Sequence, residues 1–265
     1  MWMTALSMAG IGAATLFVMM FLIWLLSTRM NNAGLVDVGW ALGLVVLANW
    51  YSWRGPGLPA RKWILAGMVV LWGLRLAIHL VRRIGREPED GRYQQLRRHW
   101  QGNNINLRFL LFFEAQALLD ILLSLPILIS ALNPSPQLSL LEYFGAALWL
   151  LSVTGESLAD IQLTTFKRNP ANRGHVCQRG LWNYSRHPNY FFEWFVWVAW
   201  AVYALASPMG WLALVCPMVM FFFLFRVTGI PATEAQALRS RGQEYARYQQ
   251  TTSAFVPWFK KTVVA

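Results

Sequence analysis

The chain has 265 residues, of which 56% are hydrophobic and only 13% are charged, and its mean hydropathy is +0.37. A water-soluble domain carries about 25% charged residues, so this composition excludes an ordinary soluble fold. Runs of about twenty apolar residues recur, each long enough to cross roughly 30 Å of hydrocarbon. The net charge of +11 resides mainly in short loops. Membrane topology explains charge placed in that way, so we expect no nucleic-acid partner.

Seven apolar spans are predicted, followed by an amphipathic or interfacial helix over 232–250. The expected fold is therefore all-α, a single integral-membrane domain over residues 1–265 with seven transmembrane helices and a C-terminal interfacial helix. In chain order the predicted spans cover about 5–27, 33–51, 63–82, 109–132, 139–160, 189–206 and 209–228.

The basic residues lie almost entirely on one side of this topology. Seven arginines fall within 82–108, and five lysines and arginines fall within 167–186. The loops predicted on the other side hold only Arg54, Arg61 and Lys62. Because loops rich in Lys and Arg stay in the cytoplasm, we expect the N-terminus outside and the C-terminus inside.

Ionisable residues within apolar spans are costly and are treated first as functional candidates. Asp37 is the deepest acid of the first half of the chain, and in its neutral form it would donate a hydrogen bond to a carbonyl. An ion pair between Asp37 and Arg75 is an equally open interpretation. Glu114 and Glu142 lie near span ends, where pairing with another residue is the favoured interpretation. For Asp120 both interpretations stay open.

Two carboxylates mark the inner end of the fifth predicted span. Glu156 and Asp160 are four residues apart, so they share one helix face. They could accept hydrogen bonds from ribose or amide groups while basic residues hold phosphates, or they could form salt bridges with those same residues. The polar residues that follow them are Lys167, Arg168, Asn169 and Arg173.

The stretch 180–193 enters the sixth predicted span from a basic loop. Pro188 suits the first turn of a helix, where its missing N–H costs nothing. The free N–H groups of that turn, next to a positively charged arginine, predict a site for an anion such as phosphate. The candidate residues are Tyr184, Arg186, His187, Asn189 and Glu193, with Arg226 expected at the same membrane level.

Familiar soluble cofactor motifs are absent from the sequence. It contains no G-x-G-x-x-G, no P-loop and no H-E-x-x-H, and its four histidines are scattered. We therefore expect no metal centre. Any nucleotide cofactor would be bound in a pocket formed by membrane helices.

Two segments resemble the steroid 5α-reductase family. They read Leu-Trp-Asn-Tyr-Ser-Arg-His-Pro-Asn-Tyr-Phe-Phe-Glu over 181–193 and Arg-Gly-Gln-Glu-Tyr-Ala-Arg-Tyr-Gln-Gln-Thr-Thr-Ser-Ala-Phe-Val-Pro-Trp over 241–258. The segment 156–167 and the segment Gly-Arg-Glu-Pro-Glu-Asp-Gly-Arg-Tyr over 85–93 fit as well. The chain looks closest to bacterial members of that group, a branch classified as a domain of unknown function. This resemblance implies a bacterial inner-membrane protein.

The resemblance implies an enzyme that uses NADPH to reduce the carbon–carbon double bond of an α,β-unsaturated ketone, most often a 3-oxo-Δ4 steroid. It assigns residues 1–132 to the substrate side and 139–260 to the cofactor. The family's substrate carboxylate falls on Asp37, with Arg75 one turn beyond the place of its companion tyrosine, where Trp72 stands. Expected cofactor contacts are Glu156, Asp160, Tyr184, Asn189, Glu193, Arg226 and Glu234.

A second enzyme class shares part of this signature. The Arg-His-Pro triplet, a late glutamate and a Tyr-x-x-Tyr pair are also similar to isoprenylcysteine and phospholipid methyltransferases, which use S-adenosylmethionine. Asn189 and the long N-terminal part favour the reductase. A lipid-binding or scaffolding protein without nucleotide binding is a third hypothesis. The expected partners are a hydrophobic small molecule and membrane lipid, with no obligate protein partner.

Overall fold

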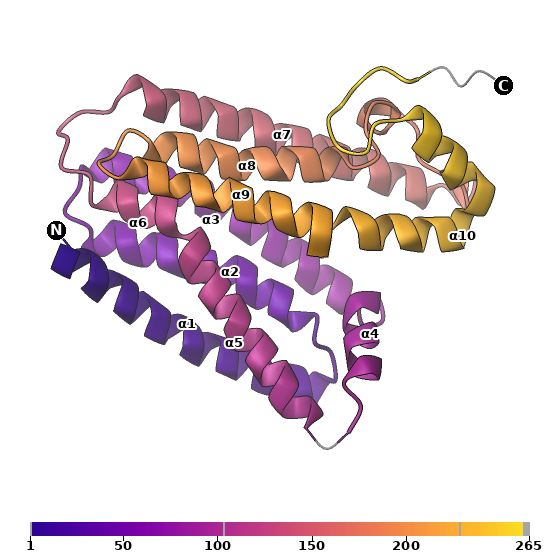
Figure 1. Cartoon of the computed structure of the whole chain (residues 1–265), viewed down its shortest axis with the longest axis horizontal. Helices are drawn as coiled ribbons and strands as arrows, with labels where there is room; N and C mark the ends of the chain where they lie inside the picture. Colours follow the sequence, from indigo (N-terminus) through magenta and orange to yellow (C-terminus); the bar gives the residue numbers. More distant parts are fainter. Residues whose placement is uncertain (1, 103, 228, 262–265) are drawn as a thin grey trace. The chain divides into compact units, whose positions relative to one another are not determined.

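The computed structural model describes residues 2–102, 104–227 and 229–261, and its main elements are helices (Figure 1). The chain divides into two compact units. Unit 1 comprises Met1–Glu142 with Tyr203–Ala213, and unit 2 comprises Tyr143–Val202 with Leu214–Ala265. The candidate site residues are distributed over both units, so each unit is described separately.

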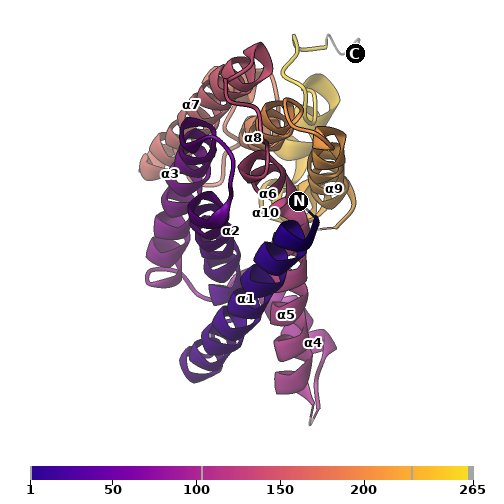
Figure 2. The same ribbon diagram turned by 90° about the vertical axis from the view of Figure 1, so that its left-hand side faces the viewer.

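Unit 1 is a bundle of long apolar helices with one short polar helix. The second helix packs against the first, third and fifth, and the first crosses the fifth obliquely (Figures 1 and 2). The sixth helix continues the fifth after a bend of 42° at Ser124. The elements are α1 (Trp2–Met30), α2 (Leu35–Arg54), α3 (Pro59–Ile84), α4 (Gly91–His99), α5 (Ile105–Leu123) and α6 (Leu125–Ala131).

Glycines allow the helices of unit 1 to approach closely. Gly12 of α1 faces Leu47 and Tyr51, and Gly73 of α3 faces backbone atoms of Ala41. Gly43 of α2 lies directly against the carboxyl group of a residue on α5. In membrane proteins van der Waals packing replaces much of the hydrophobic driving force between helices, so small residues at the crossings supply contact area.

The residue that Gly43 meets is Asp120, which is completely buried. Among the described residues, neither of its carboxyl oxygens has a hydrogen-bond partner. Replacing Gly43 with alanine would put its new methyl group onto Oδ2 of Asp120. We expect Gly43→Ala to destabilise unit 1 by about 1–3 kcal/mol, because a packed helix crossing cannot absorb an extra methyl group.

The thermal unfolding of the purified chain in detergent measures this effect. In an Asp120→Ala background the obstructing carboxyl is gone, so Gly43→Ala should cost less than half as much. Gly67 of α3 has no atom near its Cβ position, and Gly67→Ala is the matched control. An equal cost of Gly43→Ala in both backgrounds would show that the carboxyl does not limit the helix approach.

A buried ion pair joins α3 to the beginning of α7 (Leu140–Arg168). Arg61 and Glu142 are both about 1% exposed, and the guanidinium also donates to the carbonyl of Ser135 at 2.8 Å. Pairing of Glu142 near a span end was predicted, and it is confirmed. Arg61, which the sequence places in a loop, instead compensates a buried charge.

Unit 2 contains the segments that carry the sequence motifs. Gly155 of its first helix faces the ring of Phe192, so this helix and α8 pack closely. The tenth helix adjoins the π-helical turn before it. The elements are α7 (Leu140–Arg168), η1 (Pro170–Asn172), η2 (Gly180–Asn183), α8 (Pro188–Ala204), α9 (Val215–Phe222), η4 (Phe223–Val227) and α10 (Ile230–Thr251). The short helix η3 (Gly210–Leu214), which precedes α9, belongs to unit 1 except for its last residue.

Every predicted span coincides with helical structure, but the count of seven spans is not confirmed. By length and composition, four helical runs among the residues that the structure describes could cross a membrane, and the bent pair α5–α6 would make five. The four runs are Trp2–Met30, Leu35–Arg54, Pro59–Ile84 and Gly210–Thr251. Helix α8 has 17 residues, at the lower limit of the roughly 17–25 residues of a span, and it is not among these runs. The last residue of the predicted 209–228 span, Thr228, lies outside the described residues.

The run Gly210–Thr251 contains both an apolar and a polar part. Helix α10 carries five charged residues between 230 and 247, so the stretch that is apolar enough to cross lies before it. The predicted amphipathic helix over 232–250 corresponds to α10, which is broken at Gly242, where φ is +49°. The polar residues of α10 therefore lie outside the spanning segments.

Candidate functional site

The start of α8 brings the two motif segments of the sequence together. Pro188 is the first residue of α8, as predicted, and the hydroxyl of Ser185 accepts a hydrogen bond from the N–H of His187 at 3.1 Å. The N–H of Arg186 donates to the carbonyl of Ser253 at 2.8 Å. The N–H of Trp258 donates to the carbonyl of Tyr184 at 2.9 Å. The C-terminal segment 252–258 thus runs alongside residues 184–186, although some seventy residues separate them in the chain.

Glu234 of α10 is the centre of a polar cluster at this position. Its Oε1 accepts from Nε of Arg186 at 2.7 Å and lies 3.2 Å from Nε2 of His187. Its Oε2 accepts from the side-chain amide of Gln249 at 2.8 Å. Arg186 and His187 are 11% and 3% exposed, so Glu234 compensates an almost buried positive charge.

The charge state of Glu234 follows from these contacts. Burial opposes its ionised form, but hydrogen bonds from His187 and Arg186 outweigh that effect and lower the pKa of Glu234 from 4.5 to about 2. Arg186 also donates to the carbonyls of Gln249 and Thr252. Its guanidinium therefore joins α10 and the C-terminal segment to the start of α8.

Two residues that were predicted separately as cofactor contacts pair with each other inside unit 2. The side-chain amide of Asn189, in the first turn of α8, donates to Oδ1 of Asp160 on α7 at 3.3 Å. Glu156 lies one turn earlier on α7 and is 6% exposed. Glu193 lies one turn further on α8 and is partly buried. The structure thus places one carboxylate acceptor and one amide next to each other on facing helices.

The predicted basic residues surround the end of α7 and are exposed. Lys167 and Arg168 form its last turn, and Arg173 follows the short helix η1. Asn169 has a structural role there, because its side chain accepts a hydrogen bond from the N–H of Ala171 and caps η1. Arg226 is exposed in the π-helical turn η4.

The expected substrate carboxylate has partners that the sequence analysis missed. Asp37 lies in the first turn of α2, where its Oδ1 accepts from the hydroxyl of Tyr93 at 2.5 Å and its Oδ2 accepts from Arg92 at 3.0 Å. Both partners belong to α4, which Asp90 caps by accepting from the N–H of Arg92. Arg75, the partner considered from the sequence, lies in the middle of α3 and is partly buried.

Tyr93 is suited to hold a proton next to Asp37. The side chain is 4% exposed. Burial and then the neighbouring Asp37 carboxylate raise the pKa of Tyr93 well above its usual range. The resemblance of segment 85–93 was the available signal for this residue, because Arg92 and Tyr93 are its last two positions.

Comparison with known proteins places the chain in a family. The sequence model of a family described as "Protein of unknown function (DUF1295)" matches residues 23–252. This match covers most of the chain, and the chain therefore belongs to that family. No curated protein and no solved structure matches it.

Proposed function

We propose that this member of the DUF1295 family is a membrane enzyme that uses NADPH to reduce the carbon–carbon double bond of an α,β-unsaturated ketone, with 3-oxo-Δ4 steroids as the first substrates to test. The observation that carries this proposal is the contact of Asn189 with Asp160 at the start of α8. An asparagine at this position distinguishes the reductase signature from that of the related methyltransferases.

The side chains of unit 2 suit a dinucleotide in their chemistry. Asp160 accepts hydrogen bonds, as ribose hydroxyls require, and the amide of Asn189 both donates and accepts. The exposed cations Lys167, Arg168 and Arg173 suit phosphate groups. Arg186 and His187 stabilise this arrangement through Glu234, so their role in cofactor binding is indirect.

The Asp37–Tyr93 pair of unit 1 provides the proton chemistry of the proposed reaction. When bound, NADPH supplies the hydride that adds to the β-carbon of the enone. The hydroxyl of Tyr93, which donates to Asp37, is the proposed proton donor to a substrate oxygen on which negative charge develops. Asp37 accepts from the Tyr93 hydroxyl and the Arg92 guanidinium lies over the Tyr93 ring, so both hold this side chain in place. The proposed donor is therefore Tyr93 rather than a neutral Asp37, and Arg75 remains a candidate for contact with the substrate.

An enone assay tests the proposed reaction. Purified protein in detergent is mixed with NADPH and a panel of flat apolar enones that includes 3-oxo-Δ4 steroids. We expect oxidation of NADPH together with a product two hydrogens heavier than the substrate. Oxidation of NADPH with none of the enones would overturn the reductase proposal.

Binding experiments separate the two cofactor classes. We expect NADPH to raise the unfolding temperature of the protein by mass action and S-adenosylmethionine to leave it unchanged. The methyltransferase alternative is supported by the Arg-His-Pro residues, of which Arg186 and His187 contact Glu234, and by the Tyr-x-x-Tyr pair, of which Tyr248 donates to the carbonyl of Ser185. Stabilisation by S-adenosylmethionine alone would favour that alternative. The absence of a response to either nucleotide would favour a lipid-binding or scaffolding protein.

Asn189→Ala should weaken NADPH binding by about tenfold, because the cofactor loses an amide partner and Asp160 loses its donor. Titration of the protein with NADPH, followed by the change in unfolding temperature, measures the affinity. Asn183→Ala, in the same segment before α8, is the matched control and should bind NADPH normally. Unchanged affinity of Asn189→Ala would remove this residue from the cofactor site.

A further inference from the structure

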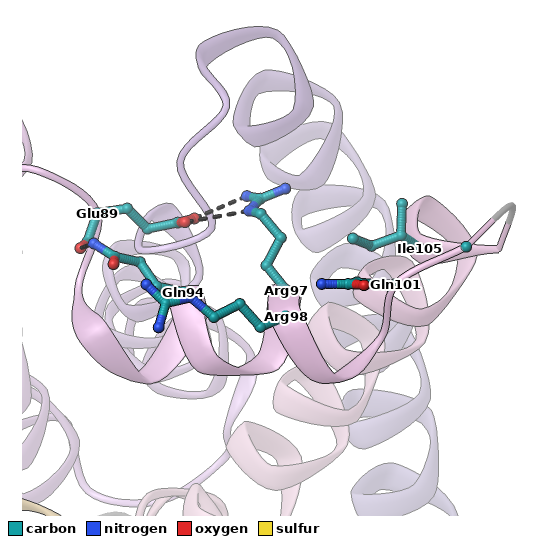
Figure 3. A pocket seen from close by; sticks show the side chains of 7 residues that line it. Glu89, Gln94, Arg97, Arg98, Gln101 and Ile105 are labelled. Atoms are coloured by element: carbon teal, nitrogen blue, oxygen red, sulfur yellow. Dashed lines mark hydrogen bonds and ion pairs between the residues drawn. The ribbon is translucent and has the colours of Figure 1, made fainter.

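A polar cleft lies on α4, the short helix that connects two of the apolar helices of unit 1. Its volume is about 470 Å³, within the range of small-ligand sites. Figure 3 shows its lining, with Glu89 and Gln94 on one side and Gln101 and Ile105 on the other. The remaining labelled side chains are those of Arg97 and Arg98.

The negative charge of Glu89, the acidic residue that lines the cleft, is neutralised by a neighbouring arginine. Arg97 donates to both oxygens of Glu89, at 2.8 and 3.2 Å, and Figure 3 marks this pair. Oε1 of Glu89 also accepts from the N–H of Ala33 at 2.7 Å, which ties this residue to the start of α2. The carbonyl of Glu89 accepts from the amide of Gln94 at 2.6 Å. Glu89 is therefore fully engaged, and its charge is balanced.

Two other side chains of the lining are uncommitted donors. Arg98 and Gln101 are exposed, and neither makes a hydrogen bond or an ion pair with another residue in the part of the chain that the structure describes. Because the charges of Glu89 and Arg97 cancel, the positive charge of Arg98 remains. A guanidinium and a primary amide opening into one cleft form a donor set for an oxyanion.

The surroundings of the cleft favour a phosphate at the membrane surface. The segment 82–108 has seven arginines against three acidic residues. The segment begins at the end of the apolar helix α3 and runs into α5, which exposes Leu107, Leu111 and Leu118 along one face. Clusters of arginine beside spanning helices attract anionic headgroups.

We propose that the α4 cleft is a phosphate-binding site in which Arg98 is the main contact and Gln101 provides a second donor. Its ligand is the phosphate of an anionic lipid headgroup or of a soluble phosphate ester, two sources with the same chemistry. This site belongs to unit 1 and is independent of the proposed cofactor residues of unit 2.

The experiment uses the full chain in detergent and measures thermal stabilisation by three probes: phosphatidylglycerol in mixed micelles, glycerol 3-phosphate in solution, and diacylglycerol as a lipid without phosphate. We expect stabilisation by phosphatidylglycerol and none by diacylglycerol. An equal response to glycerol 3-phosphate would identify a soluble ester as sufficient, whereas its absence would identify a lipid ligand. Stabilisation by neither phosphate probe would overturn the proposal.

Two substitutions that each remove one positive charge, one inside the cleft and one outside it, locate the site. Arg98→Gln should lower the affinity for the binding phosphate by about tenfold or more, because a charge-assisted hydrogen bond is lost. Arg98→Lys should retain part of the affinity. Arg82→Gln removes the same charge from an exposed position of α3 outside the cleft, and should change the affinity little. Equal losses for Arg98→Gln and Arg82→Gln would show diffuse attraction and contradict a defined site.

Discussion

Glu234→Gln should lower the stability of unit 2 by about 3 kcal/mol, the effect of removing one partner of a buried charge pair. Arg186 and His187 both contact Oε1 of this residue, and both are largely buried. A neutral amide of the same size keeps the packing but leaves the Arg186 guanidinium without a counterion. For a chain of this length we expect the unfolding temperature in detergent to fall by roughly 6–10 °C.

Glu244→Gln is the matched control for this experiment. Glu244 lies on the same helix and contacts His175 at 3.2 Å, but its side chain is 38% exposed. Exposed pairs contribute little, so its loss should change stability by less than about 1 kcal/mol. Equal effects of the two substitutions would show that the polar cluster around Glu234 does not stabilise unit 2.

The pH dependence of stability provides a second measurement of the same contact. The pKa of Glu234 is lowered to about 2 from an ordinary value of 4.5. Its ionised form therefore stabilises the folded state fully above pH 4.5, and this contribution is lost as the pH falls towards 2. The difference in unfolding temperature between the wild type and Glu234→Gln should shrink over that interval. A constant difference would contradict the assignment.

Tyr93→Phe should lower the turnover of an active enone by about 10²–10⁴-fold, the usual contribution of a positioned general acid. The substitution removes only the hydroxyl that donates to Asp37. Because the expected cofactor residues belong to unit 2, NADPH affinity should stay unchanged. Steady-state rates with saturating enone, combined with NADPH titration, separate the two effects.

Variants of the neighbouring residue test how Tyr93 is held. Asp37→Ala removes the acceptor of Tyr93 and the counterion of Arg92, so turnover should fall while cofactor affinity is spared. Tyr143→Phe is the control, because Tyr143 is 60% exposed. Full activity of Tyr93→Phe would move the donor to another residue. Full activity of Asp37→Ala would show that Tyr93 needs no carboxylate for its orientation.

The packing of the C-terminal segment explains why the two motif segments of the sequence occur together. The hydroxyl of Tyr248 donates to the carbonyl of Ser185 at 3.0 Å, and the hydroxyl of Ser185 donates to the carbonyl of Phe255 at 2.8 Å. Substitution in either segment would leave a buried polar group without its partner. The Arg-His-Pro triplet therefore indicates this shared packing more directly than it indicates one particular chemistry.

The local features of the protein follow from the sequence by itself. Hydrophobic length and helical periodicity are properties of contiguous residues, so each predicted apolar segment forms a helix. The start of α8 at Pro188 was predictable for the same reason, since proline acts on its own turn. The shared face of Glu156 and Asp160 depends only on helical spacing.

The tertiary structure decided which distant residues become partners. Asp37 pairs with Arg92 and Tyr93 rather than with the arginine of the adjacent span considered from the sequence, because the loop after α3 folds α4 towards the start of α2. Arg186, predicted beside a phosphate site, pairs with Glu234, which lies 48 residues further along the chain. A charged side chain near a helix end pairs with whichever group the packing of helices brings within a few ångströms. Sequence spacing cannot specify that group, since it depends on how separate helices cross.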